Sequence, residues 1–253
     1  MIMATATIQS VSQTEKAGLF TICFEGESYT EFQKFITKND ADVELQPDLQ
    51  EILRVMRRMV QKLGFLERLF RPEGKMSDRV AAIPVSPNKL RLYCLRLSDG
   101  VLIVGNGGQK KTRTYDESNE LVGYVLTLQK LDALLKAAER KGTISIEKTT
   151  ITGLDNKNFR YMKHAVETER LFLKVTDETP DEIKLKVDWS LDISTAIDDA
   201  LHKKRMTQKE LAARLGTSPA SVHSWLGGTH NFTLSTLARI SAVLGVPLIS
   251  VVK

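Results

Sequence analysis

Residues 207–226, TQKELAARLGTSPASVHSWL, place polar side chains at spacings suited to hydrogen bonding with another molecule. Gln208 is followed by the small residue Ala212 four positions later and by Gly216 eight positions later. Apolar Val222 comes fourteen positions after Gln208. Two short helices that cross at about 90–120° need a small residue where they touch and a glycine that takes positive φ in the turn. The spacing therefore predicts a helix-turn-helix.

The second helix of this pair turns Val222 and Trp225, three residues apart, toward the core and leaves its polar side chains outside. The N-terminal part of such a helix enters the major groove of DNA. Serine and threonine hydroxyls hydrogen bond to bases or phosphates, and an alanine methyl contacts the methyl of thymine. The predicted DNA contacts are Gln208, Thr217, Ser218, Ala220, Ser221, His223 and Ser224, with Asn231 in the loop that follows. His223 has no metal-ligand partner at useful spacing, and no metal or cofactor is expected.

Helix-start signals support this arrangement. Thr207 is placed as an N-cap with Glu210 completing a capping box, and Ser218 is placed as the next N-cap ahead of Pro219. The expected helices of this region are residues 193–204, 208–215, 219–226 and 234–244. The same Leu, Ala and Gly pattern also suits a small helical hairpin without a DNA-binding role.

From about Leu191 to Val251 the chain resembles the Cro/C1-type (XRE) helix-turn-helix family. The runs TPDEIKLKVDWSLDI, before the first helix, and WLGGTHNFTLSTLARISAVLG, at the end of the second and beyond, are similar to HigA-like antitoxins of toxin-antitoxin pairs. The resemblance implies binding to operator DNA, with Gln208 at a backbone phosphate. Such domains usually bind pseudo-palindromes as dimers, so we expect a homodimer, with the fourth helix and the tail VPLISVV pairing two chains.

Length and composition indicate two globular domains. The chain has 253 residues, 42% of them hydrophobic and 26% charged, and no run approaches the roughly 18 apolar residues that span a bilayer. The N-terminus lacks a basic segment followed by an apolar one, so we expect a cytoplasmic protein with no membrane partner. Cys23 and Cys94 each lie in an apolar run and are predicted to be reduced core residues.

Charge is unevenly distributed along the chain. Residues 50–113 contain fourteen Lys or Arg against five acids, whereas residues 165–188 contain seven acids against four bases. A basic first half favours an anionic partner. The basic block and the acidic segment could also attract one another, although solvated charged faces give similar patterns.

The first half alternates between helical and strand-like runs. Expected strands are residues 5–12, 18–24, 80–85, 90–97 and 101–105, and expected helices are residues 29–37, 48–70 and 121–141. The fold class is therefore α+β: a first domain with a small antiparallel sheet and helices at residues 1–160, an acidic linker at residues 161–190, and an all-α helix-turn-helix domain at residues 191–253.

The order of these elements resembles the RelE/ParE superfamily of toxins, with HigB-like toxins among its members. The residues that carry the resemblance are LRLYCLRL followed by VLIVGNGGQKKTRT, similar to a strand pair leading into a Lys-Lys-Thr loop. The sequence GNGG stands where relatives often have a bulkier stretch containing histidine or an aromatic residue. RelE-like members are ribosome-dependent endoribonucleases, whereas some ParE-like members bind gyrase and cleave nothing.

All four histidines lie beyond residue 163, which excludes histidine acid/base chemistry from the first domain. The resemblance instead implies that lysine and arginine stabilise charge on a phosphate of mRNA attacked by its own 2′-hydroxyl. The candidate residues are Arg91, Lys110, Lys111, Arg113, Lys75, Arg79 and Tyr115. A solvated surface role is the alternative for each.

These patterns lead to one hypothesis and two alternatives. The hypothesis is a DNA-binding regulator of a toxin-antitoxin type system, with a fused RelE-like toxin domain held inactive in cis. The first alternative is a metal-independent, ribosome-dependent mRNA endoribonuclease regulated by its C-terminal domain. The second is a repressor with an inert sensor domain.

Overall fold

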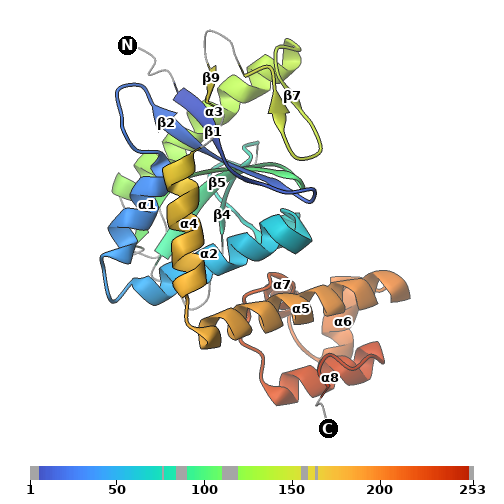
Figure 1. Cartoon of the computed structure of the whole chain (residues 1–253). Coiled ribbons are helices and arrows are strands. Elements are labelled where there is room, and N and C mark those ends of the chain that lie inside the picture. The colour runs from blue at the N-terminus through green and yellow to red at the C-terminus, as the bar shows by residue number, and fades with distance from the viewer. Residues whose placement is uncertain are drawn as a thin grey trace. The chain divides into compact units, whose positions relative to one another are not determined.

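The computed structural model divides the chain into two compact units, which we call unit 1 (Met1–Pro180) and unit 2 (Asp181–Lys253) (Figure 1). It describes residues 6–75, 77–83, 90–109, 119–154, 159–162 and 165–250. Unit 1 combines a sheet with helices and unit 2 is helical, which confirms the α+β class. Within the described residues, no helix is long and apolar enough to cross a membrane.

Seven of the strands in the described part of unit 1 form one sheet in the order β3-β4-β5-β6-β2-β1-β9. Their bounds are β1 Ala6–Gln13, β2 Gly18–Phe24, β3 Arg71–Pro72, β4 Val80–Ile83, β5 Leu90–Ser98, β6 Val101–Gln109 and β9 Phe159–Met162. The pairs β2·β6 and β1·β9 are parallel and the other pairs are antiparallel. The expectation of a small antiparallel sheet was wrong, because parallel pairs join segments that are distant in sequence and leave no local turn signal.

Helices cover both faces of this sheet. Alternate strand residues such as Phe20, Tyr93 and Ile103 pack with the long helix α3 (Asn119–Arg140) in one buried cluster. The short hairpin of β7 (Ser145–Ile146) and β8 (Ile151–Thr152) also contributes to this cluster. The opposite face carries α1, α2 and α4, which contact the strands from that side (Figure 1).

The helices α1 (Glu31–Asp40) and α4 (Val166–Glu178) are fastened to each other by buried groups. The Thr30 and Thr168 hydroxyls lie 2.8 Å apart, and the rings of Phe32 and Phe172 are 5.9 Å apart between centroids. The backbone N–H of Phe32 also donates to the hydroxyl of Thr21 on β2. Residues 166–178, which the sequence assigned to an acidic linker, therefore form part of the core of unit 1.

The amphipathic run expected as one helix over residues 48–70 is divided. Helix α2 (Gln46–Arg58) continues as a π-helical turn, η1 (Met59–Leu63), and stops at Gly64, and a 3-10 turn, η2 (Glu67–Leu69), follows. Gly64 has φ of +78°, and a Cβ there would lie 2.8 Å from the carbonyl oxygen of Asp99 in the β5–β6 turn. Side-chain periodicity could not reveal this long-range approach.

Unit 2 contains four helices among its described residues: α5 (Asp181–Lys204), α6 (Gln208–Leu215), α7 (Pro219–Leu226) and α8 (Leu234–Leu244). The bounds of α6, α7 and α8 agree with the sequence prediction, but α5 begins twelve residues before the expected start at residue 193. Pro180 precedes α5, and Asp181 and Glu182 occupy its first turn, where acidic side chains stabilise a helix. The remainder of the expected linker thus belongs to this helix.

Candidate nucleic-acid interface

The start of α6 is fixed by two reciprocal hydrogen bonds. The Thr207 hydroxyl accepts from the backbone N–H of Glu210 at 3.2 Å, and the Glu210 carboxylate accepts from the backbone N–H of Thr207 at 2.7 Å. The Thr207 backbone N–H and then its hydroxyl hold the pKa of Glu210 below its usual value. This is the predicted capping box, and it leaves Gln208 exposed in the first turn of α6.

The turn between α6 and α7 depends on Gly216, which has φ of +61° and no Cβ to oppose that conformation. After it, the backbone N–H of Thr217 donates to the carbonyl of Ala212 at 3.0 Å. Arg239 of α8 donates to the carbonyl of Leu215, the last residue of α6. These contacts hold the end of α6 where α7 begins.

Ser218 caps the start of α7. Its hydroxyl accepts from the backbone N–H of Ser221 at 3.1 Å and lies 2.9 Å from the Ser221 hydroxyl, and Pro219 occupies the first helical position. The two serine hydroxyls are therefore held in place by each other. Because a hydroxyl has two lone pairs and one hydrogen, each keeps capacity for a further partner.

The face of α7 that contains the other predicted contacts is open. Ala220, His223 and Ser224 are exposed, whereas Val222 and Trp225 are buried against the other helices of the unit. Thr217 and Ser221 are half-buried. The predicted contacts of α6 and α7 are thus carried by two consecutive helices whose relative position is fixed.

The loop after α7 contains an aromatic group that the sequence reading missed. His230 packs edge-on against Phe232 at 4.8 Å and against Trp225 at 6.4 Å between ring centroids. Burial lowers the pKa of His230 from its ordinary value. The available signal was its position between two aromatic residues near the end of the second helix, which indicates packing as readily as exposure.

Two serines of α5 fasten the end of α7 and this loop. The buried Ser194 hydroxyl donates to the carbonyl of Leu226 at 2.7 Å, and the Ser190 hydroxyl donates to the carbonyl of His230 at 3.2 Å. Asn231, another predicted contact, is exposed, but it lines a groove next to α5. It is therefore not part of the outward face of α7.

Comparison with protein families identifies this arrangement. Residues 199–250 match a family model described as Helix-turn-helix. This match supports an XRE-like helix-turn-helix in the C-terminal region. No curated protein and no solved structure matches the chain. The family match supports a DNA-binding transcription regulator and gives no information on residues before 199.

The helix-turn-helix domain has the positive charge that favours binding to DNA. Between residues 201 and 250, Glu210 is the only acid, whereas six residues are Lys or Arg. Five of these cations lie on the end of α5, on α6 or between them and are exposed: Lys203, Lys204, Arg205, Lys209 and Arg214. Exposed cations attract the phosphates of DNA and release its counterions on binding.

The candidates in unit 1 are placed differently. Arg79 donates through Nε to Asp132 of α3 at 2.6 Å, and its guanidinium lies 2.8 Å from Glu139 of the same helix. Lys75 belongs to the same loop and is exposed, with its backbone N–H bonded to Asp78. This loop is packed on α3, so Arg79 is committed to an ion-pair network.

Arg91 lies on β5 and is half-buried. Burial lowers the pKa of its guanidinium, and the nearby cation Arg71 lowers it further, whereas Glu73 raises it. The remaining candidates, Lys110, Lys111, Arg113 and Tyr115, lie outside the described residues. In the part of the chain that is described, no group of three His, Cys, Asp or Glu side chains could hold a metal ion.

Proposed function

We propose that the chain is a sequence-specific transcription regulator that inserts α7 into the major groove of operator DNA. The supporting observation is the open face of α7, held at a fixed position by the Gly216 turn and two helix caps. In this geometry the first turn of a recognition helix meets base edges while the preceding helix contacts the backbone.

The residue chemistry suggests a division of roles. Gln208, exposed at the start of α6, contacts a backbone phosphate and sets the register without reading sequence. Ser221, His223 and Ser224 hydrogen bond to base edges, and Ala220 contacts a thymine methyl. Thr217 and Ser218 contact the flanking phosphate, with Ser218 also acting as the cap of α7. Asn231 contacts phosphate from the loop.

A triple variant, Gln208→Ala, Ser221→Ala and His223→Ala, tests this face. We expect affinity for promoter DNA of the chain's own gene to fall about 100-fold or more, since each lost contact is worth about 1–2 kcal/mol. Gel shift or fluorescence anisotropy at one stated salt concentration measures the change. A matched triple variant at exposed positions of unit 1, Glu44→Ala, Lys62→Ala and Lys75→Ala, should bind as the parent does. If the variant with Gln208, Ser221 and His223 replaced bound this DNA as tightly as the parent, the surface that reads DNA would lie elsewhere.

We further propose that unit 1 is a RelE-like toxin domain held inactive in cis, within a toxin-antitoxin type of system. The support is the sequence resemblance and the run of cations Lys110, Lys111 and Arg113, which follows β6 in the sequence. Arg91, Lys110, Lys111 and Arg113 would contact mRNA phosphate on the ribosome, Tyr115 would stack on a base or donate a proton, and Lys75 would add a cation. Arg79 would act by holding its loop against α3, because its guanidinium already bonds Asp132.

Induction of residues 1–180 beside the full chain tests this second proposal, since these residues form one compact unit. We expect growth arrest and cleaved mRNA from the fragment and little from the full chain. The Arg91→Ala fragment, checked for equal soluble yield, is the control and should be inactive. Arrest by the full chain would favour a ribosome-dependent ribonuclease regulated by unit 2. No effect from a soluble, folded fragment would favour an inert sensor domain and would leave the DNA-binding proposal intact.

A further inference from the structure

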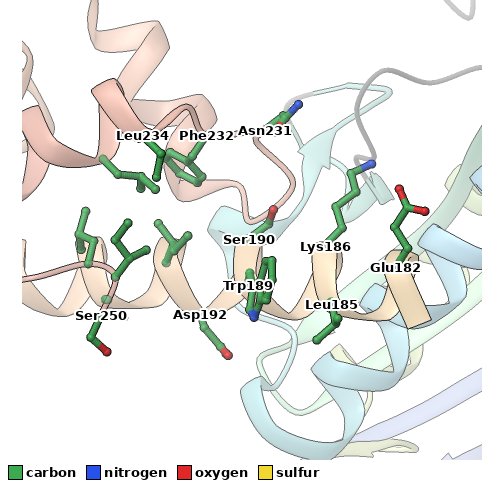
Figure 2. Close-up of a pocket in the computed structure, with 15 residues that line it drawn as sticks. Glu182, Leu185, Lys186, Trp189, Ser190, Asp192, Asn231, Phe232, Leu234 and Ser250 are labelled. Atoms are coloured by element: carbon green, nitrogen blue, oxygen red, sulfur yellow. The ribbon is translucent and has the colours of Figure 1, made fainter. Parts of the chain in front are cut away.

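Unit 2 has an open groove on the side of α5 (Figure 2). Its volume is about 1190 Å³. Eight residues of α5 form one wall: Glu182, Leu185, Lys186, Trp189, Ser190, Asp192, Ile193 and Ala196. The other wall is formed by Asn231, Phe232, Leu234 and Leu237 together with residues 248–250.

Large apolar side chains are exposed along this groove. Trp189 is 62% exposed, Leu234 74%, Leu185 48% and Ile249 46%. Together they present on the order of 400 Å² of apolar surface, which is within the size range of patches that serve as binding sites on monomeric proteins. An exposed tryptophan beside a hollow is also typical of the anchor residue of a protein interface.

Nucleic acid is a poor occupant of this groove. No residue of α7 lines it, apart from the loop residue Asn231 none of the predicted DNA contacts does, and residues 181–200 contain six acids against two lysines. This balance is opposite to that of residues 201–250, with their single acid. The acidic α5 wall therefore disfavours phosphate, and the groove beside it suits a protein partner with an apolar surface.

The wall formed by α5 has the pattern of a self-complementary surface. Its members recur at spacings of three and four residues, and Trp189 lies midway along the wall, seven positions from Glu182 and seven from Ala196. When two copies of such a stripe meet antiparallel about a two-fold axis, the middle residue lies next to its own copy and each end meets the other end. The rim carries both signs of charge, Glu182 and Asp192 with Lys186, so two copies meet without a block of like charge.

We propose that this groove binds a second copy of the chain, with the two α5 helices antiparallel and Trp189 of each copy near the two-fold axis. The ridge of Leu185 and Trp189 of one copy then enters the groove of the other. The role of this dimer rests on the proposed DNA-binding function, whereas the experiment that tests the dimer does not. The outward face of the eight-residue helix α7 reads few base pairs, and a two-fold pair of α7 helices reads two half-sites.

The surface is large enough for such a pair. The four exposed apolar side chains contribute about 800 Å² over two copies, and the half-buried Phe232 and Ile193 with the polar rim extend this toward the roughly 1,200 Å² of a stable interface. Pairing on this side leaves the face of α7 uncovered, because Ala220, Ser221, His223 and Ser224 take no part in the groove.

Sedimentation velocity of the full chain without DNA, from about 1 to 100 µM, tests the proposal. We expect a dimer, and we expect Trp189→Lys and Trp189→Glu each to weaken dimerisation at least 100-fold, as for an interface anchor. An equimolar mixture of the two variants should dimerise again, because opposite charges then meet at the axis. Tyr29→Lys, at a side chain of unit 1 that is 58% exposed, is the matched control and should sediment as the parent.

A parent chain that is monomeric throughout this range would overturn the proposal, as would variants that dimerise like the parent. Recovery of the dimer only in a mixture with the parent, and not between the two variants, would overturn the placement of Trp189 at the axis. Circular dichroism of each variant checks folding, which an exposed position should preserve. A chain that dimerises through Trp189 but binds no DNA would reject the DNA-binding function and leave this interface standing.

Discussion

The two units use their cations in different ways. In unit 1, Arg79 is bound to Asp132 and Glu139, and Arg96 donates to the carbonyl of Phe65 at 2.6 Å. In unit 2, the five cations between residues 203 and 214 are exposed. The basic block of the first half was the most conspicuous charge feature of the sequence, yet at least part of it holds the fold together. A count of cations along the chain therefore does not locate a binding surface.

Replacing Arg79 gives the largest expected effect and tests this contrast directly. The side chain of Asp132 is 2% exposed and also pairs with Lys136 at 2.7 Å. Arg79→Met removes the guanidinium and leaves this buried carboxylate with Lys136 and the backbone N–H of residue 79, which donates at 3.2 Å, so we expect the free energy of unfolding to fall by about 3 kcal/mol. Urea denaturation of the full chain followed by circular dichroism measures it.

Lys75→Met is the matched control because Lys75 lies in the same loop and is exposed. Its effect should stay within about 0.5 kcal/mol. If Arg79→Met changed the free energy of unfolding as little as Lys75→Met, the ion pairs of Arg79 would not stabilise the fold. Its guanidinium would then be available for a phosphate, as the sequence predicted.

The distance in sequence between interacting residues explains which parts of the fold could be predicted. Helices α6 and α7 were predicted with their observed bounds because their start signals lie within three or four residues of each start, as with Thr207 and Glu210. The parallel pairing of β2 with β6 joins Thr21 to Val104, 83 residues apart. Such pairing depends on tertiary contacts that no local pattern encodes.

The residues of the candidate site also divide into those set by local periodicity and those that depend on distant contacts. The outward positions on α7 follow from a period of 3.6 residues and two buried anchors, Val222 and Trp225, so the sequence placed them. The ion pair of Arg79 with Asp132, 53 residues away, could not be predicted from the local sequence that made Arg79 a candidate phosphate contact. The groove beside α5 also needed the structure, since Trp189 lies in a stretch assigned to a linker.

Two helix caps of the same chemistry allow a finer comparison of the units. Thr30 of unit 1 accepts from the backbone N–H of Gln33 at 3.0 Å and is buried with Thr168, whereas Thr207 of unit 2 is exposed. Thr207→Ala should cost about 1 kcal/mol, the usual worth of a cap. Thr30→Ala should cost about 2 kcal/mol, because the buried Thr168 hydroxyl also loses its partner.

Urea denaturation of both alanine variants measures these costs, and serine at either position should restore most of the loss because it keeps the hydroxyl. Equal costs for the two alanine variants would mean that burial of the Thr30–Thr168 pair adds nothing to the cap. The outcome would then weaken the view that unit 1 depends on buried polar contacts more than unit 2 does.

The smallest expected effect concerns His230, a titratable group held among aromatic rings. Burial lowers the pKa of His230 below its ordinary value of 6.5, so the folded chain favours the neutral imidazole. The unfolded chain takes up the proton first as pH falls, and the stability from this group is present above about pH 6.5 and is lost below it. His230→Phe keeps a ring beside Phe232 and removes the titration. Melting temperatures of parent and variant should therefore diverge between pH 7.5 and about 5.5, with the parent losing more, and parallel curves would mean that His230 does not sense pH in this loop.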